Sequence, residues 1–180
     1  NFTYRENIRR LEGRGRVVRF SPLRDNRLPD DCDFLYLPGG YPEFYLPALS
    51  ANASMKQSVR DYIESGGHAL AECGGMMYLC DTIRGMDGRD YPMCGVLSEA
   101  AMMEGMRLHL GYRRMVYKGK ELRGHEFHYS STIGSTPSVA QQYNVRGEAV
   151  ETPLYRYKNL LAGYTHLYWG EHDDLWTWFD

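Results

Sequence analysis

Three short apolar runs in the first half of the chain predict buried strands. They are Arg16–Phe20, Asp33–Leu37 and His68–Glu72, and turn-forming proline or glycine follows the first two. Runs of this length between turn signals are typical of strands inside a sheet rather than of helices. We therefore expect a sheet assembled from segments that are well separated in the sequence.

Helical patterns separate the later runs. Residues from about Glu43 to Ser65 predict a helix that is broken near Ser50–Ser54 and ends at Gly66-Gly67. A second helix is predicted from Gly74 to Arg84. Strands that alternate with helices imply right-handed crossovers, so the first half of the chain predicts an α/β fold with a largely parallel sheet.

The second half of the chain is richer in strand signal. Its expected strands are Cys94–Met103, Arg107–Tyr117, Leu122–Ser131, Gln141–Val145 and, late and mostly buried, Gly163–Trp169. We expect these segments to add antiparallel strands at an edge of the sheet, with loops over the active face.

Composition places the chain in an ordinary globular class. Its 180 residues suit a single domain, 1–180, with 43% hydrophobic and 24% charged residues. A formal net charge of −2 gives no basic surface for nucleic acid. No apolar run approaches the roughly eighteen residues of a membrane span and no signal peptide opens the chain, so we expect no membrane partner.

The four cysteines point to a reducing compartment. They show no CxxC pairing, and a domain of this size does not need disulfides, so we expect free thiols in the cytoplasm. Cys32, Cys80 and Cys94 then act as small hydrophobic residues in or near the core. Cys73 differs from them because of its neighbours.

Cys73 lies in the segment Ala71–Gly75, between a predicted strand and a predicted helix. A nucleophile on such a sharp turn projects from the sheet toward the positive end of the helix, which favours the thiolate. The N–H of Gly74 is then placed to donate to the oxyanion of a tetrahedral intermediate. These five residues alone fit a buried structural cysteine beside a glycine turn equally well.

A second glycine turn strengthens the catalytic interpretation. It is the segment Leu37–Glu43, which follows the preceding strand and so should lie beside Cys73 at the carboxyl edge of a parallel sheet. We expect the N–H groups of Gly39 and Gly40 to complete an oxyanion hole there, because glycine permits the backbone conformations of an anion nest. Taken by itself this turn is an ordinary end to a strand.

A thiol nucleophile needs a base, and six histidines are available. His68 begins a strand at the wrong end of the sheet, and His166 lies late in the chain, where a sheet presents a base to Cys73. His125 and His128 lack the spacing of a helical metal motif and should face opposite sides of a strand. We expect no metal site, and the pattern alone favours His166 modestly over His125 and His128. The others are His109, a mid-strand structural histidine, and His172, in a polar tail.

Together these motifs resemble the glutamine amidotransferase domain of cobyrinic acid a,c-diamide synthase, a class I-like glutaminase of cobalamin biosynthesis. The resemblance covers nearly the whole chain. The segments that carry it are Tyr4–Asn7, Phe20–Leu23, Leu37–Glu43, Ala51–Met55, Ala71–Leu79, Met93–Leu97, Arg123–Ser130 and Tyr164–His166.

The resemblance implies a flavodoxin-like, mostly parallel sheet flanked by helices, with Cys73 as nucleophile and His166 as the residue that activates it. It also implies an N-terminal ATP-dependent synthetase domain outside this chain. ATP and Mg²⁺ belong to that domain, and this domain needs no cofactor. Ammonia from glutamine would amidate the a and c carboxylates of cobyrinate. The start at Asn1 without methionine fits a cut inside a longer polypeptide.

The sequence departs from the family at the catalytic histidine. Many class I glutaminases carry Glu two residues after it, where this chain has Tyr168, so we expect a Cys–His dyad. The corrinoid branch often has His-x-His-Phe at this strand, where this chain has His166–Trp169. The change leaves His166 intact. Ala71 replaces a frequent glycine before the nucleophile and is small enough to keep the turn.

Alternative functions remain open at this point. Hydrogenobyrinate and nickel-sirohydrochlorin a,c-diamide synthases share these motifs, and a non-catalytic docking module or a cysteine hydrolase with the same sheet are further possibilities. His125, Glu126 and His128 are candidates for the glutamine pocket or the interface through which ammonia leaves, or for a hydrogen-bonded strand of purely structural importance. Because ammonia must be kept from bulk water, the chain alone is expected to show weak glutaminase activity or none.

Overall fold

A mixed four-stranded sheet lies at the centre of the protein. The computed structural model describes residues 2–105, 107–171 and 175–179. The order of strands in this sheet is β1 (Phe34–Leu37), β2 (His68–Glu72), β12 (Leu160–Gly163) and β11 (Leu154–Tyr157). β1, β2 and β12 run parallel and β11 is antiparallel to β12. The parallel strands therefore bring segments from the start, middle and end of the chain to one carboxyl edge.

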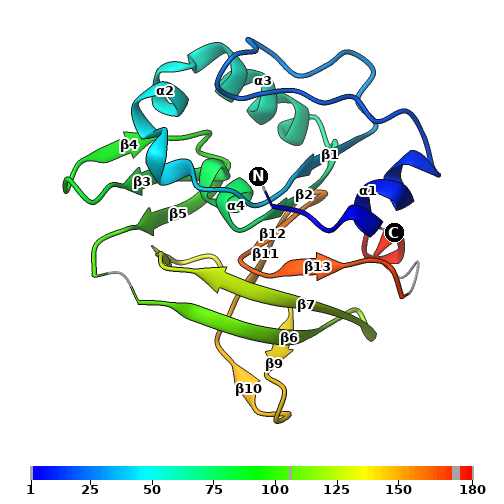
Figure 1. Cartoon of the computed structure of the whole chain (residues 1–180). Helices are drawn as coiled ribbons and strands as arrows, with labels where there is room; N and C mark the ends of the chain where they lie inside the picture. Colours follow the sequence, from blue (N-terminus) through cyan, green and yellow to red (C-terminus); the bar gives the residue numbers. More distant parts are fainter. Residues whose placement is uncertain (1, 106, 172–174, 180) are drawn as a thin grey trace.

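Each face of this sheet is buried against a different layer. One face packs against the helices above it in Figure 1 through Leu35, Leu37, Ala69, Ala71 and Leu160. The other face, which includes Leu70 and Leu161, packs with residues of β6 and β7 and with Trp178 near the carboxyl end. Alternation along a strand sends neighbouring side chains to opposite faces, so short apolar strands are buried on both sides.

The helices are few and short. They are α1 (Arg5–Glu12), η1 (Pro42–Phe44), α2 (Leu46–Ala51), α3 (Ala53–Glu64), α4 (Gly74–Leu79) and η2 (Trp176–Trp178). The predicted break near residues 50–54 is confirmed at Asn52, whose side chain caps α3 by accepting from the N–H of Met55 at 3.3 Å. Across the described part of the chain, no helix has both the length and the apolar character of a membrane span.

Two further sheets complete the fold (Figure 1). The order of the first is β4 (Asp90–Pro92), β3 (Cys80–Arg84), β5 (Leu97–Met102) and β8 (Ser131–Gly134). The order of the second, which is antiparallel, is β10 (Ala149–Val150), β9 (Gln141–Tyr143), β6 (His109–Tyr117), β7 (Lys120–His128) and β13 (His166–Tyr168). The fold is thus α/β with parallel segments, and the second half adds the expected antiparallel strands.

Three predicted elements differ from the structure. Residues Arg16–Phe20 form no strand, because charged side chains interrupt the run and Val18 remains 46% exposed. The helix predicted to reach Arg84 ends at Leu79, where the chain turns into β3 and pairs with β5. The predicted strand Gly163–Trp169 is divided at Tyr164 and Thr165, so that β12 and β13 belong to different sheets.

Candidate active site

Cys73 occupies a strained turn between β2 and α4. Its backbone has φ 48° and ψ −113°, a region that non-glycine residues seldom adopt and that costs about 1–3 kcal/mol. The Cys73 N–H donates to the carbonyl of Gly163 at 2.7 Å, which ties the turn to the end of β12. The side chain is only 6% exposed. This strained strand-to-helix geometry is that of a nucleophile elbow.

The two glycine turns lie against each other. A Cβ atom added to Gly74 would lie 2.6 Å from the Gly40 carbonyl oxygen, and one added to Gly75 would lie 2.2 Å from that of Leu37. A Cβ atom on Gly39 would lie 2.1 Å from Cε1 of His166. The structure therefore gathers Gly39, Gly40 and Gly74 beside the elbow, with His166 in contact with the same turn.

This close packing predicts that Gly75→Ala destabilises the fold by about 1–3 kcal/mol, because a methyl group cannot fit against a backbone carbonyl without moving it. Gly15→Ala is the matched control, since a Cβ there meets nothing within 4 Å. Urea unfolding of both variants measures the difference. Equal midpoints for the two variants would contradict the packing described here.

His166 is a buried histidine at the start of β13. It pairs with His125 of β7, and the two imidazole rings stack with centroids 4.9 Å apart. The ring of Phe2 contacts His166 edge-on at 4.9 Å, and the Phe2 N–H donates to the Gly39 carbonyl at 2.7 Å. Burial, followed by the neighbouring His125 and His128, lowers the pKa of His166 to about 4. The imidazole is therefore neutral near pH 7 and able to accept a proton.

The thiol of Cys73 is protonated in this state. Burial raises its pKa to about 12, the Gly74 N–H lowers it, and the carboxylates of Glu43, Glu72 and Glu126 raise it further. The expected preference for thiolate at a helix N-terminus is outweighed, because the six-residue α4 cannot compensate for desolvation beside acidic groups. Attack by sulfur from this arrangement requires a base to take the thiol proton.

Glu72 is a fully buried carboxyl group directly before the nucleophile. It accepts hydrogen bonds from the Tyr36 hydroxyl at 2.8 Å and from the Leu167 N–H at 3.1 Å. Its Oε2 lies 3.9 Å from Nδ1 of His166, and that nitrogen has no hydrogen-bond partner within the described residues. Burial raises the pKa of Glu72 to about 8, while Tyr36 and the Leu167 N–H lower it. The sequence pattern did not single out Glu72. The signal for it was a lone acidic residue at the end of the apolar run Ala69–Ala71.

The candidate pocket residues divide between the two faces of β7. His125 faces His166 and accepts from or donates to the Tyr4 hydroxyl through Nδ1 at 2.6 Å. Glu126 and His128 are buried, and His128 Nε2 lies 2.7 Å from Glu126 Oε1. The expected separation of His125 from His128 is therefore confirmed, while Glu126 and His128 form a buried pair.

Other side chains hold this pair in place. The Arg113 guanidinium contacts Glu126 Oε2 at 2.5 Å, and the Thr152 hydroxyl donates to Glu126 at 3.0 Å. The His128 ring stacks on Tyr164 with centroids 3.6 Å apart. Burial raises the pKa of Glu126, but the hydrogen bond with His128 and then the charge of Arg113 lower it by more, so the pKa of this carboxyl group lies below its usual value.

His109 lies next to this pair, and donor atoms of His109, Glu126 and His128 are all within 4.8 Å of one another. The rings of His109 and His128 are parallel, with an interplanar angle of 2°. A metal ion lies in the plane of each imidazole that binds it, so parallel rings at different heights cannot share one ion without rotating. We assign no metal to this cluster, in which Arg113 already provides the positive charge.

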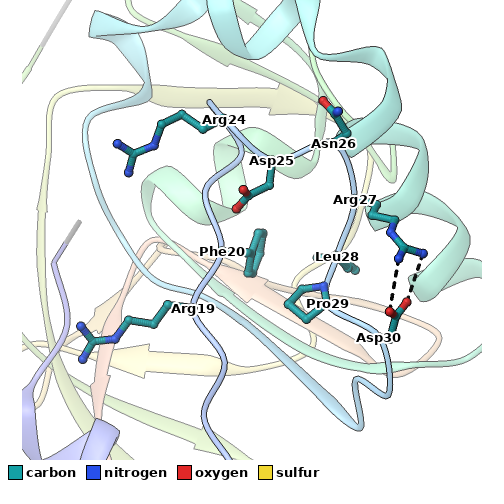
Figure 2. A pocket seen from close by; sticks show the side chains of 9 residues that line it. All are labelled: Arg19, Phe20, Arg24, Asp25, Asn26, Arg27, Leu28, Pro29 and Asp30. Carbon is teal, nitrogen blue, oxygen red and sulfur yellow. Dashed lines mark hydrogen bonds and ion pairs between the residues drawn. The ribbon is translucent and has the colours of Figure 1, made fainter.

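The remaining histidines do not join the site. His68 is exposed at the first position of β2, at the opposite end of the strand from the elbow. His172 lies outside the described residues. Figure 2 shows a surface pocket that contains none of the predicted site residues. The lining residues are Arg19, Phe20, Arg24, Asp25, Asn26, Arg27, Leu28, Pro29 and Asp30.

The fold and this site define a class of protein. Residues 1–174 match the family described as the CobB/CobQ-like glutamine amidotransferase domain, and the chain belongs to that family. Two solved structures resemble its fold. One, described as a glutamine amidotransferase, has a TM-score of 0.64 and 19% identity over 97% of this chain and 90% of its own. The other, PurLQS from Thermotoga maritima, has a TM-score of 0.59 and 18% identity over 90% of this chain and 80% of its own.

Curated relatives narrow the class further. The chain is 38% identical over 180 residues to the cobyrinate a,c-diamide synthase of Priestia megaterium, covering 94% of this chain and 39% of the relative. It is 40% identical over 176 residues to the cobyrinate a,c-diamide synthase of Fusobacterium nucleatum, covering 93% of this chain and 39% of the relative. The chain therefore spans about two-fifths of the length of these relatives, and it is a glutamine amidotransferase domain homologous to cobyrinate a,c-diamide synthase.

Proposed function

We propose that this domain hydrolyses glutamine at Cys73 and supplies ammonia to an ATP-dependent synthetase domain that amidates the a and c carboxylates of cobyrinate. The observation that carries the proposal is the elbow at Cys73, packed against the Gly39–Gly40 turn that also contacts His166. The identity to cobyrinate a,c-diamide synthases supports the choice of substrate. Four free cysteines support a reducing, cytoplasmic location.

The chemistry proceeds through a thioester. His166 accepts the thiol proton as Cys73 sulfur attacks the side-chain amide carbon of glutamine. The N–H groups of Gly74 and of the Gly39–Gly40 turn stabilise the oxyanion. The C–N bond then breaks, and the proton held by His166 leaves with ammonia. Water, deprotonated by His166, then attacks the γ-glutamyl thioester. The C–S bond breaks, glutamate is released, and His166 returns the proton to the Cys73 sulfur.

Charged side chains near Cys73 are the candidates for binding glutamine. Glu126 is close enough to Cys73 to influence the pKa of its thiol, and its charge is shared with Arg113 and His128. A carboxylate and a guanidinium are complementary to the α-amino and α-carboxylate groups of an amino acid. We assign Glu126 and His128 to the border of the glutamine pocket on this complementarity, while His125 stacks on the ring of His166.

The remaining part of the enzyme sets the tetrapyrrole substrate. ATP and Mg²⁺ belong to the synthetase domain, and no residue of this chain is assigned to them. The same glutaminase domain is compatible with hydrogenobyrinate or nickel-sirohydrochlorin as the acceptor of ammonia. Competing these three acids against one another in the assembled enzyme distinguishes them, and we expect cobyrinate to have the highest kcat/KM.

We expect the chain alone to hydrolyse glutamine slowly and the assembled enzyme to do so at least tenfold faster, because the isolated thiol is buried and protonated. Glutamate release by the chain, with and without the synthetase domain and its substrates, measures this. A docking module without catalysis would release no glutamate in either case, and that result would overturn the proposed function. Equal rates would show that docking does not complete the site.

A further inference from the structure

The position that holds the orienting acid in many glutaminases is occupied here by Tyr168, yet His166 has an acidic neighbour. Nδ1 of His166 is buried and has no hydrogen-bond partner among the residues that the structure describes. Oε2 of the Glu72 carboxyl group lies 3.9 Å from this nitrogen, in a side chain that is 2% exposed. Glu72 precedes the nucleophile in β2, whereas Tyr168 follows His166 in β13.

We propose that Glu72 is the positioning residue of His166 and completes a Cys73–His166–Glu72 triad in which the acid comes from the nucleophile's own strand. This inference rests on the proposed function, since it assigns a role within the same reaction. Acceptance of the Nδ1 proton by Glu72 leaves the Nε2 lone pair to take the thiol proton. It also places a negative charge beside the imidazolium that forms when Cys73 attacks.

The hydrogen bonds around Glu72 are arranged for this role. The Leu167 N–H, one residue after His166, donates to Oε1, so the carboxyl group is fixed to the backbone that carries the histidine. Tyr36 donates to Oε2 and itself lies 2.9 Å from the Thr3 hydroxyl. A carboxylate oxygen accepts more than one hydrogen bond, so Oε2 keeps capacity for the Nδ1 proton. A small rotation of either side chain closes the 3.9 Å separation, and such contacts often tighten only with substrate bound.

The protonation state of Glu72 should make the tautomer of His166 depend on pH. The groups that face Glu72 are Tyr36 from β1, Tyr4 from the N-terminal segment, His166 with the Leu167 N–H from β13, and the Cys73 thiol. With the pKa of Glu72 at about 8, its carboxyl group is largely protonated at pH 6 and ionised at pH 9. A protonated Glu72 donates to Nδ1 and forces the proton of a neutral imidazole onto Nε2, the wrong tautomer for a base. An ionised Glu72 accepts from Nδ1 and restores the active tautomer.

A purely structural role for Glu72 makes different predictions. In that case the carboxyl group only ties β2 to β1 and β13, and its loss changes stability without changing the state of His166. The chain offers a matched control in Glu99, which is also buried and accepts from a backbone N–H, that of Thr136 at 2.9 Å, and from a tyrosine hydroxyl, that of Tyr155 at 3.4 Å. No histidine among the described residues contacts Glu99. Glu99→Gln therefore reproduces the loss of a buried carboxyl group without touching the site.

The first test is ¹⁵N NMR of histidine-labelled chain at pH 6 to 9.5, with His166 assigned by its loss in His166→Ala. We expect the His166 tautomer to change from Nε2–H to Nδ1–H with an apparent pKa of about 8 in the unmodified chain and in Glu99→Gln. Glu72→Gln, whose amide donates to Nδ1, should remain Nε2–H throughout. Tyr36→Phe removes a bond that lowers the pKa of Glu72, so the change should move to higher pH. A pH-independent tautomer, or one that is the same in Glu72→Gln, overturns the proposal.

The second test measures reaction of Cys73 with 6-diazo-5-oxo-norleucine in the assembled enzyme. Glu72→Gln should slow labelling at pH 9 by between about 10-fold and about 10⁴-fold, the upper figure being the loss that a carboxylate-to-amide change behind a catalytic histidine causes when it fixes the wrong tautomer. It should also remove the rise in labelling rate near pH 8. Glu99→Gln should label at the unmodified rate. Unchanged labelling in Glu72→Gln would reject the role of Glu72 while leaving the glutaminase function intact. Failure of the unmodified enzyme to label would instead reject the function itself, and the NMR result would still decide whether Glu72 controls His166.

Discussion

Replacing Cys73 by alanine will abolish glutamine-dependent amidation and leave amidation with free ammonia intact. In the proposed mechanism no other thiol can form the thioester, because the remaining cysteines are packed elsewhere in the core or at its edge, at Cys32, Cys80 and Cys94. A nucleophile and its base act together, so removal of the nucleophile lowers kcat by about 10³-fold or more. Alanine keeps the Cβ atom of Cys73, so the substitution does not relieve the backbone strain at φ 48°. We therefore expect the stability of the fold to change little.

The measurement is product formation by the assembled synthetase with glutamine or with ammonium chloride as nitrogen source. Cys94→Ala is the matched control, since Cys94 is 2% exposed and belongs to the same core cluster. It should retain both activities within a few-fold. Glutamine-dependent activity in Cys73→Ala would show that another group attacks the amide. Loss of ammonia-dependent activity would show that the substitution disrupts docking rather than chemistry.

Replacing His166 by alanine will lower the rate of glutamine hydrolysis by about 10²–10⁴-fold, the usual contribution of a general base. The effect is large here because the pKa of the Cys73 thiol is raised to about 12, so almost no thiolate exists at pH 8 without a base. The defect should diminish as the pH rises, since hydroxide then substitutes for the missing base. Steady-state glutamate release between pH 7 and 10 measures both features.

His68→Ala is the control for this experiment, because His68 is exposed at the far end of β2. It should leave the rate and its pH dependence unchanged. A His166→Ala enzyme with a normal rate at pH 7.5 would reject His166 as the base. It would direct attention to the buried pair of His128 and Glu126, which lies on the other face of β7 from His125.

Local sequence patterns predicted the parts of the site that depend on short stretches of chain. The elbow at Cys73 needs only a strand, a tight turn and two glycines, all within Ala69–Gly75. The turn after β1 was placed beside it because the carboxyl ends of parallel strands meet at one edge. The register of β1 with β2, which pairs Leu37 with Ala71, brings these two segments together as expected.

The parts that depend on distant pairing were not predicted. The division of Gly163–Trp169 into β12 and β13 follows from pairing with β2 on one side and β7 on the other, and neither partner is visible in the local pattern. That division is also what brings His166 next to Glu72. An acidic residue beside a nucleophile can equally be a helix cap or a solvated end of a strand, so its role as a neighbour of His166 required the structure.

The most direct test of the central claim is the mass of the chain, alone and with the proposed synthetase domain, after treatment with 6-diazo-5-oxo-norleucine. This glutamine analogue forms a carbon–sulfur bond with a nucleophilic cysteine and releases dinitrogen. We predict one adduct per chain, located on Cys73 by peptide mapping, prevented by Cys73→Ser and slowed by His166→Ala. An adduct on another residue, or none on Cys73 in either state, would contradict the assignment of Cys73 as the glutaminase nucleophile.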